Sequence, residues 1–175
     1  MSCIPQTPIA SRYLDSGWTS FVTPIDTTNA IGIGEPTHAE VLVVPGMATT
    51  TQEPGRIVQI QIEETAGSSA NLKKADLLLL LWTRATSAPT TPTLNTVYNP
   101  STTNYIGAFK IAEADYVRWS DTVWQATIKP SHVFTSGSDA VASDFHCVVL
   151  CNESSAITYA ASAALRVRIV TEPGV

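Results

Sequence analysis

Short apolar runs of strand length alternate along the chain with stretches rich in Thr, Ser, Pro, Gly and Asn. A sandwich of two antiparallel sheets needs a turn after roughly every 8–12 residues, and this spacing is typical of such a fold. The runs cover residues 38–44, 56–62, 75–82, 105–111, 145–151 and 165–170. With weaker candidates included, the pattern predicts an all-β, jelly-roll-like antiparallel sandwich of about eight or nine strands with very little helix.

The segment 56–63 has the most regular alternation in the chain. A strand period of two predicts that one set of its side chains faces the core and the other faces water. The core set is Val58, Ile60 and Ile62, and the wet set is Gln59, Gln61 and Glu63. Ile57 is the one apolar exception, since its position places it on the wet face.

The leucine-rich segment 75–82 allows two interpretations. Leucine favours helix, and 72–82 can be drawn as an amphipathic helix with Lys73 and Lys74 outside. The run is short, however, lacks a helix C-cap and lies between strand-like neighbours. We therefore expect a central strand that is buried on both faces.

Residues 1–37 differ from the rest because prolines recur and periodicity is poor. The best strand candidate there is 19–25, which Pro24 would confine to a sheet edge. Five side chains are too apolar to leave in water, namely Tyr13, Leu14, Trp18, Phe21 and Val22. We expect residues 1–37 to form an extended N-terminal arm that folds against the sandwich or reaches a neighbouring subunit, with 38–175 as the sandwich domain.

Residues 85–104 form a long stretch rich in Ser, Thr and Pro, and a loop of this length is usually functional. It contains Pro89, Pro92 and Tyr98, which are candidate contacts to a partner. A structureless crossover between the sheets is an equally good interpretation. Trp119 is the aromatic side chain that we most expect to be exposed, because charged and polar residues surround it; the other central aromatics can fill the core or line a surface.

Composition argues against several classes of function. The net charge is −5 and the ten basic residues are scattered, whereas nucleic-acid binding demands clustered Lys and Arg. The longest apolar run, 77–82, is far shorter than the roughly 20 residues that span a bilayer. No signal peptide is visible at the N-terminus, which favours synthesis in the cytosol.

The sequence contains no residue pattern that points to a disulfide, a metal site or a catalytic site. Cys147 and Cys151 would lie roughly 13 Å apart in a regular strand, too far for a disulfide, so with Cys3 they are expected to be reduced. His146 and Cys147 point to opposite faces and do not suit one metal ion. The carboxylates at 63, 64, 113 and 115 diverge or face solvent, and no serine lies in a nucleophile elbow. We expect no catalytic residues, no cofactor, no metal and no enzymatic activity.

The elements from about residue 55 to 170 follow a definite order. An alternating strand opens with Gly55 (55–63), a leucine-rich strand ends in an aromatic residue (77–82), and a Pro/Thr/Asn loop follows. A strand with a short Ala/Asp turn (106–117) comes next, and a closing strand (163–170) ends the series. This order resembles that of capsid decoration proteins of tailed bacteriophages. The resemblance implies a non-enzymatic cement protein on the capsid surface of the virion, made in the host cytoplasm.

The resemblance also implies the partners. These are the major capsid protein and further copies of the chain, with a trimer favoured, and neither nucleic acid nor membrane. The alternative is a receptor- or glycan-binding module of a phage tail or fibre. Exposed, coplanar Trp119 and Tyr side chains would favour the glycan alternative, whereas a buried set together with an arm that reaches a neighbour would favour the cement role.

Overall fold

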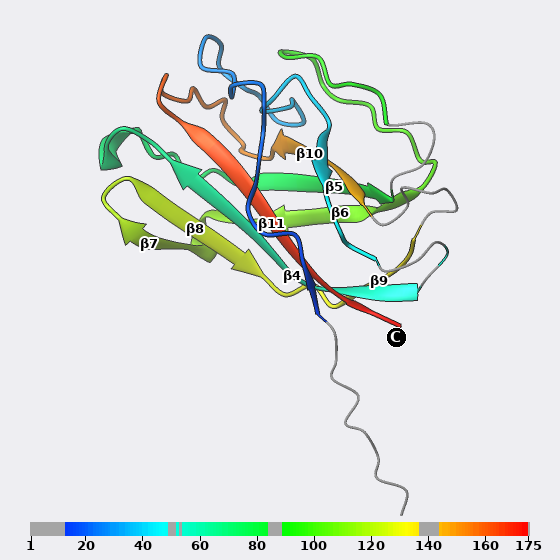
Figure 1. The fold of residues 1–175 in the computed structure, drawn as a ribbon. Coiled ribbons are helices and arrows are strands. Elements are labelled where there is room, and N and C mark those ends of the chain that lie inside the picture. Colours follow the sequence, from blue (N-terminus) through cyan, green and yellow to red (C-terminus); the bar gives the residue numbers. More distant parts are fainter. Residues whose placement is uncertain (1–12, 49–51, 53, 84–88, 137–143, 175) are drawn as a thin grey trace, which may run out of the picture.

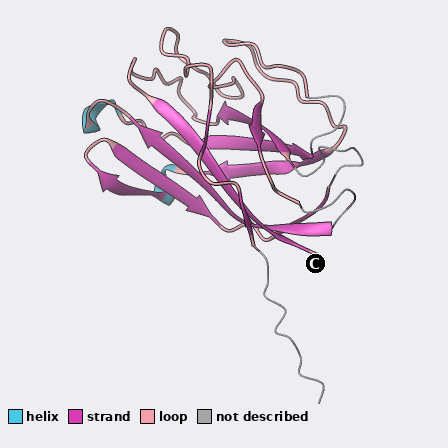
Figure 2. Ribbon diagram, in the orientation of Figure 1, coloured by secondary structure: helices cyan, strands magenta, loops and turns pink. Residues whose placement is uncertain are grey.

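The computed structural model describes residues 13–48, 52, 54–83, 89–136 and 144–174. Within these residues, eleven strands and two single-turn 3-10 helices form two antiparallel sheets packed face to face (Figures 1 and 2). The antiparallel two-sheet sandwich predicted from the sequence is therefore confirmed. The strand count exceeds the expected eight or nine because two of the strands are only two residues long.

One sheet has seven strands and the other has four. The larger sheet has the order β1-β11-β4-β8-β7, with β2 also on β11 and β9 also on β4. Its strands are β1 (Leu14–Asp15), β2 (Thr19–Ser20), β4 (Pro54–Thr65), β7 (Tyr116–Ser120), β8 (Val123–Ile128), β9 (His132–Thr135) and β11 (Ala164–Pro173). The smaller sheet has the order β3-β10-β5-β6. Its strands are β3 (Leu42–Val44), β5 (Leu77–Thr83), β6 (Tyr105–Ile111) and β10 (Phe145–Cys151).

The main core lies between the two sheets, where side chains of alternating positions meet. Fully buried members from four central strands are Ile60, Ile62, Leu79, Leu81, Phe145, Cys147, Val167 and Ile169. Phe134 and Phe145 pack edge to face across the sandwich, with ring centroids 4.9 Å apart. Burying one such aliphatic or aromatic side chain stabilises the fold by about 1.5–3 kcal/mol.

Leu77–Thr83 is a strand and not a helix, as expected from its strand-like neighbours. Its outer face is also buried, and Leu80 and Trp82 belong there to a second apolar cluster with Tyr98 and β10. The segment 89–104 supplies the cover (Figure 1). This side of the molecule therefore has a third layer, which explains why an alternating pattern is missing from β5.

A β-bulge in β4 corrects the face assignment of 56–63. The register with β11 runs from Gln59 opposite Val170 directly to Ile57 opposite Thr171, so Val58 is the extra residue. Side chains on either side of a bulge no longer follow the simple period of two. Ile57 is fully buried and Val58 only half-buried, which reverses the prediction for this pair.

The predicted wet face of β4 is also largely covered. Gln61 and Glu63 are only 9% and 8% exposed. Arginines of the neighbouring strand β11 lie over them, since Arg166 pairs with Glu63 and Arg168 donates to Gln61 Oε1 at 3.3 Å. The two guanidinium groups donate hydrogen bonds to the Glu63 carboxylate and the Gln61 amide oxygen. This face is therefore polar without being fully solvated.

Two predicted strands in the N-terminal part are shorter than expected. The candidate 19–25 forms a strand only over Thr19–Ser20, and 38–44 only over Leu42–Val44. Between them the chain follows a loop that contacts the sandwich through isolated bridges, Ile31 with Ile157 and Pro36 with Leu150. Residues 25–37 therefore contribute side chains to the same core as the strands.

Candidate functional site

The four N-terminal side chains proposed as contacts lie at different depths. Tyr13 is 57% exposed, whereas Leu14, Trp18 and Phe21 are half-buried. The Trp18 ring packs over the guanidinium of Arg166 at 5.4 Å. Of these four, only Tyr13 presents most of its surface to solvent.

Phe21 stacks on a buried histidine. Its ring and the His38 ring are parallel, with centroids 3.7 Å apart. The Thr37 hydroxyl donates to the Val149 carbonyl at 3.1 Å and lies 2.8 Å from His38 Nδ1. Because a hydroxyl has one proton, we assign the second bond to donation by His38 Nδ1–H. Burial lowers the pKa of His38 to about 3, so the ring is neutral at physiological pH.

The three loop residues proposed as partner contacts are instead packed inside the chain. Pro89, Pro92 and Tyr98 are buried. The Tyr98 hydroxyl donates to the Thr90 carbonyl at 2.7 Å, and its ring meets Trp82 edge on. Tyr98 belongs to the apolar cluster on the outer face of β5 and β10, so in the single chain its ring packs on the chain's own sheet.

Strand β7 carries the most exposed tryptophan of the described residues. Trp119 is 73% exposed and its neighbour Val117 is 65% exposed. Strand β7 ends the seven-stranded sheet and pairs only with β8 among the described strands. The register skips Trp119, which marks a bulge that a sequence pattern does not reveal. The exposure of Trp119 agrees with its polar sequence neighbours, whereas Val117 was not singled out.

The tyrosines near Trp119 do not form a platform with it. Tyr116, three residues earlier, is 7% exposed, and Tyr98 belongs to the covering loop, where its ring packs on the outer face of the other sheet. Tyr105 also belongs to the other sheet, where its ring packs 5.4 Å from that of Trp82. A sugar ring that stacked on Trp119 would meet none of these three aromatic faces.

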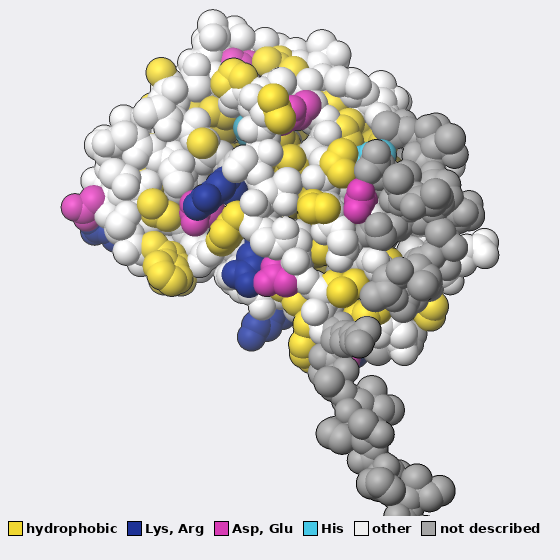
Figure 3. Space-filling view, viewed as in Figure 1, with side chains coloured by type: hydrophobic (Ala, Val, Ile, Leu, Met, Phe, Trp, Pro, Cys, Tyr) yellow, Lys and Arg dark blue, Asp and Glu magenta, His cyan; other side chains and the backbone are white. Residues whose placement is uncertain are grey.

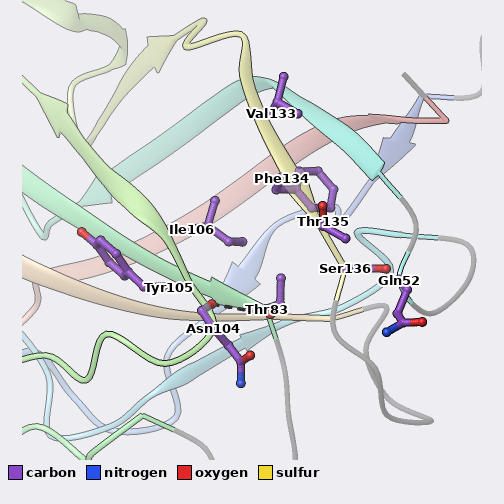
Figure 4. Close-up of a pocket in the computed structure, with 9 residues that line it drawn as sticks. All are labelled: Gln52, Thr83, Asn104, Tyr105, Ile106, Val133, Phe134, Thr135 and Ser136. Carbon is purple, nitrogen blue, oxygen red and sulfur yellow. Dashed lines mark hydrogen bonds between the residues drawn. The ribbon is translucent and has the colours of Figure 1, made fainter.

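An open cleft of about 580 Å³ lies between β6 and β9. Figure 4 shows Tyr105 and Ile106 on β6 and Val133 to Thr135 on β9 at its two sides. Amide and hydroxyl side chains complete the lining of described residues, which are Gln52, Thr83, Asn104, Tyr105, Ile106, Val133, Phe134, Thr135 and Ser136. The apolar pattern of the sequence does not reveal this cleft, because it does not predict a strand over β9.

The adjacent carboxylates Glu63 and Glu64 point to opposite faces, as expected for a strand. Glu64 is completely buried and accepts backbone N–H bonds from Lys73 at 2.6 Å and Lys74 at 2.7 Å. Burial raises its pKa despite these bonds. The carboxylate therefore anchors the turn at 73–74 to the sheet, which is a structural role.

Cys147 and Cys151 are free and buried in β10, as predicted. Burial raises the pKa of both thiols, which keeps them protonated. Cys3 lies outside the described residues. Within the described part of the chain, no group of three or more His, Cys, Asp and Glu side chains could hold a metal ion. None of the helices found there is long and apolar enough to cross a membrane.

Charged side chains lie mostly in opposite-sign pairs. In the part of the chain that the structure describes, six ion pairs join basic side chains to carboxylates, among them Lys110 with Asp76 at 2.9 Å. On the face seen in Figure 3, most blue side chains have a magenta one close by, and other magenta side chains lie without a blue neighbour. Most of these positive charges are thus neutralised locally by carboxylates.

Comparisons with known proteins leave the family of this chain open. No protein-family model matches it, and no curated protein matches it significantly. One solved structure, described as "Structure of a marine algae virus of the order Picornavirales", is 11% identical and covers 94% of this chain and 67% of that chain. Its TM-score is 0.21, which carries no argument about fold or function.

Proposed function

We propose that the protein is a non-enzymatic structural protein of a bacteriophage virion that binds the outside of the capsid and stabilises it. The observation that carries this proposal is the free edge strand β7, which presents Trp119 and Val117 to solvent. The partner on the shell would be the major capsid protein. The resemblance in element order from 55 to 170 is the reason why the proposal names a capsid decoration protein and not another kind of virion protein.

The chemistry of the β7 edge favours a protein partner. A tryptophan that is 73% exposed leaves a large apolar surface in water, and tryptophan is enriched among the residues that dominate binding energy. An edge strand also has backbone groups directed away from its one neighbour. Because the nearby tyrosines do not extend the aromatic surface, a protein contact fits this edge better than a glycan does.

The test is co-sedimentation of the purified protein with decoration-free phage heads. Saturable binding at a fixed stoichiometry is expected for the unmodified protein. Trp119→Ala should weaken it at least 30-fold, which corresponds to about 2 kcal/mol for a dominant interface residue. Val97→Ala is the matched control, since Val97 is 66% exposed on the covering loop, away from β7.

Two results would contradict the proposal. Absence of binding to heads at micromolar concentration would exclude the cement role. Equal effects of Trp119→Ala and Val97→Ala would exclude the β7 edge as the contact. Circular dichroism of both variants checks that the sandwich remains folded, and because both positions are solvent-exposed we expect no change.

A further inference from the structure

The cleft between β6 and β9 separates two strand edges. Among the described strands, β6 pairs only with β5, and β9 pairs only with β4. At one end a hydrogen bond joins the strands, with His132 Nε2 2.9 Å from the Ile106 carbonyl oxygen. Beyond this bond, toward Tyr105 and Thr135, the strands separate and the cleft opens (Figure 4). The edges on its two sides offer backbone groups to an extended chain.

The lining of the cleft fits an uncharged peptide. The described residues that line it are apolar or neutral, and none is Asp, Glu, Lys or Arg. Val133 is 65% exposed and Tyr105 39% exposed, so apolar surface is available at the rim. The volume of about 580 Å³ falls within the range of roughly 300–1,000 Å³ that is usual for binding sites.

The chain itself contains a segment of matching chemistry. Residues 2–11, with the sequence SCIPQTPIAS, carry no charged side chain and include two isoleucines. Pro5 and Pro8 hold φ near −65°, which favours an extended conformation and lowers the entropy lost on binding. The prolines also lack N–H groups, so binding would use carbonyl oxygens and the Ile4 or Ile9 side chain in addition to the remaining N–H donors.

The position of β1 decides which cleft this segment can reach. Ile57 pairs with Thr171 on one side and His132 on the other, and Thr171 pairs with Leu14. The chain therefore enters β1 at the end of the sandwich where β9 lies, with β11, β4 and β9 between β1 and the cleft of the same copy. Twelve extended residues span up to about 40 Å, enough to reach a neighbouring molecule.

We propose that the cleft between β6 and β9 binds the uncharged segment 2–11 of a second copy of this chain. Pro5 and Pro8 restrict the backbone of this segment. A path to the cleft of the same copy would have to cross three strands, so the cleft of a neighbouring molecule is the more direct target. The exchange would join copies into an oligomer without any change in the sandwich. This inference deepens the proposed function by naming the contact between copies, but it is tested without capsids.

Disulfide trapping in the full chain tests the proposal, with native Cys3 as the probe. Thr135→Cys places a thiol on the exposed β9 wall of the cleft. The buried Cys147 and Cys151 are protonated and do not compete. In a glutathione redox buffer, the variant should form a reducible species of twice the chain mass on denaturing electrophoresis. The same variant with Cys3→Ser should form none.

The matched control is Ser155→Cys, an exposed position in a loop away from the cleft. It should give less than one tenth of the trapped species. Light scattering of the unmodified protein should show a mass above that of the 18.7 kDa chain, and Val133→Glu should lower it by placing a charge among the uncharged described residues of the cleft.

Three results would overturn the proposal: a monomer at all concentrations, equal trapping by Thr135→Cys and Ser155→Cys, or a bond from Cys3 to the introduced thiol that forms only within one chain. The two proposals can fail separately. Trapping between copies without binding to heads would refute only the capsid role, whereas head binding without trapping would refute only this contact.

Discussion

At the scale of single residues, the most informative side chain is Glu64, whose buried carboxylate is held by backbone donors. Two backbone N–H groups, from Lys73 and Lys74, donate to its two oxygens. Glu64→Gln leaves one of these donors facing an amide NH₂. We expect the free energy of unfolding to fall by about 1–3 kcal/mol in urea denaturation, the usual cost of an unsatisfied buried group.

The control for this prediction is Glu113→Gln. Glu113 is exposed and pairs with Lys74 at 3.3 Å, so its replacement should change the free energy of unfolding by less than about 1 kcal/mol. If Glu64→Gln were as stable as the unmodified protein, the turn at 73–74 would not depend on the carboxylate. The sequence pattern predicts that Glu64 is solvated. Its burial depends on the turn at 73–74, which folds back onto the sheet, and the pattern around Glu64 does not indicate this turn.

His38 gives the stability of the protein a defined dependence on pH. Its pKa is about 3 in the folded state and about 6.5 in an unfolded chain. The unfolded state therefore binds more protons below pH 6.5, and stability is lost as the pH falls from 6.5 toward 3. The contribution of this one group approaches about 1.4 kcal/mol per pH unit.

Comparison with His38→Phe isolates this effect from that of other titrating groups. The variant keeps an aromatic ring against Phe21 but cannot be protonated. The difference in unfolding free energy between the two proteins, measured in urea at pH 7 and pH 5, should shift by about 1–2 kcal/mol in favour of the variant at pH 5. An unchanged difference would mean that His38 keeps its ordinary pKa in the folded state.

At the scale of elements, the central strands followed from the sequence, and the details that position the surfaces did not. Apolar periodicity predicts β4, β5, β6, β10 and β11, because each buries one or both faces in a core. The bulge at Val58 depends on the register with β11, and the pattern carries no information about register. The cleft escaped prediction because β9 is a short edge strand with one buried apolar residue, Phe134.

The covering loop illustrates a further limit of sequence patterns. The pattern of β5 predicts burial on both faces, which implies that some segment covers the outer face. Nothing in 85–104 indicates which segment this is, since the loop has no apolar periodicity. Tyr98 illustrates this, because the pattern does not show that its ring packs on the chain's own β5 and β10.

Gly55 at the start of β4 tests how tightly β9 is packed. A Cβ atom at this position would lie 2.6 Å from Cζ of Phe134, a buried side chain that cannot move freely. Gly55→Ala should therefore lower the unfolding free energy by about 1–3 kcal/mol, as overpacked cores do. Gly32→Ala is the control, because its nearest contact is an ordinary 3.5 Å to Glu35. An unchanged unfolding free energy in Gly55→Ala would mean that Phe134 and β9 can shift to make room for the methyl group without loss of stability.

At the scale of the whole molecule, the question is whether residues 1–37 and 38–175 form separate units, as the sequence suggested. The described part of the N-terminal segment supplies two completely or nearly buried side chains, Ile25 and Ile31, to the main core. Its strands β1 and β2 also cover the edge of β11. These contacts favour one cooperative unit that begins no later than residue 13.

Removal of residues 1–37 should therefore unfold the protein and not merely detach an arm. Loss of each buried isoleucine alone costs about 2–5 kcal/mol, and a whole domain is stable by only about 5–15 kcal/mol. Residues 38–175 should show neither cooperative thermal unfolding nor the near-UV circular dichroism signal of fixed aromatic side chains. Ile31→Ala in the full chain should retain both, with a lower midpoint. If residues 38–175 instead unfolded cooperatively like the full chain, residues 1–37 would not be needed for the stability of the sandwich. They would then be an arm available for contacts with a partner.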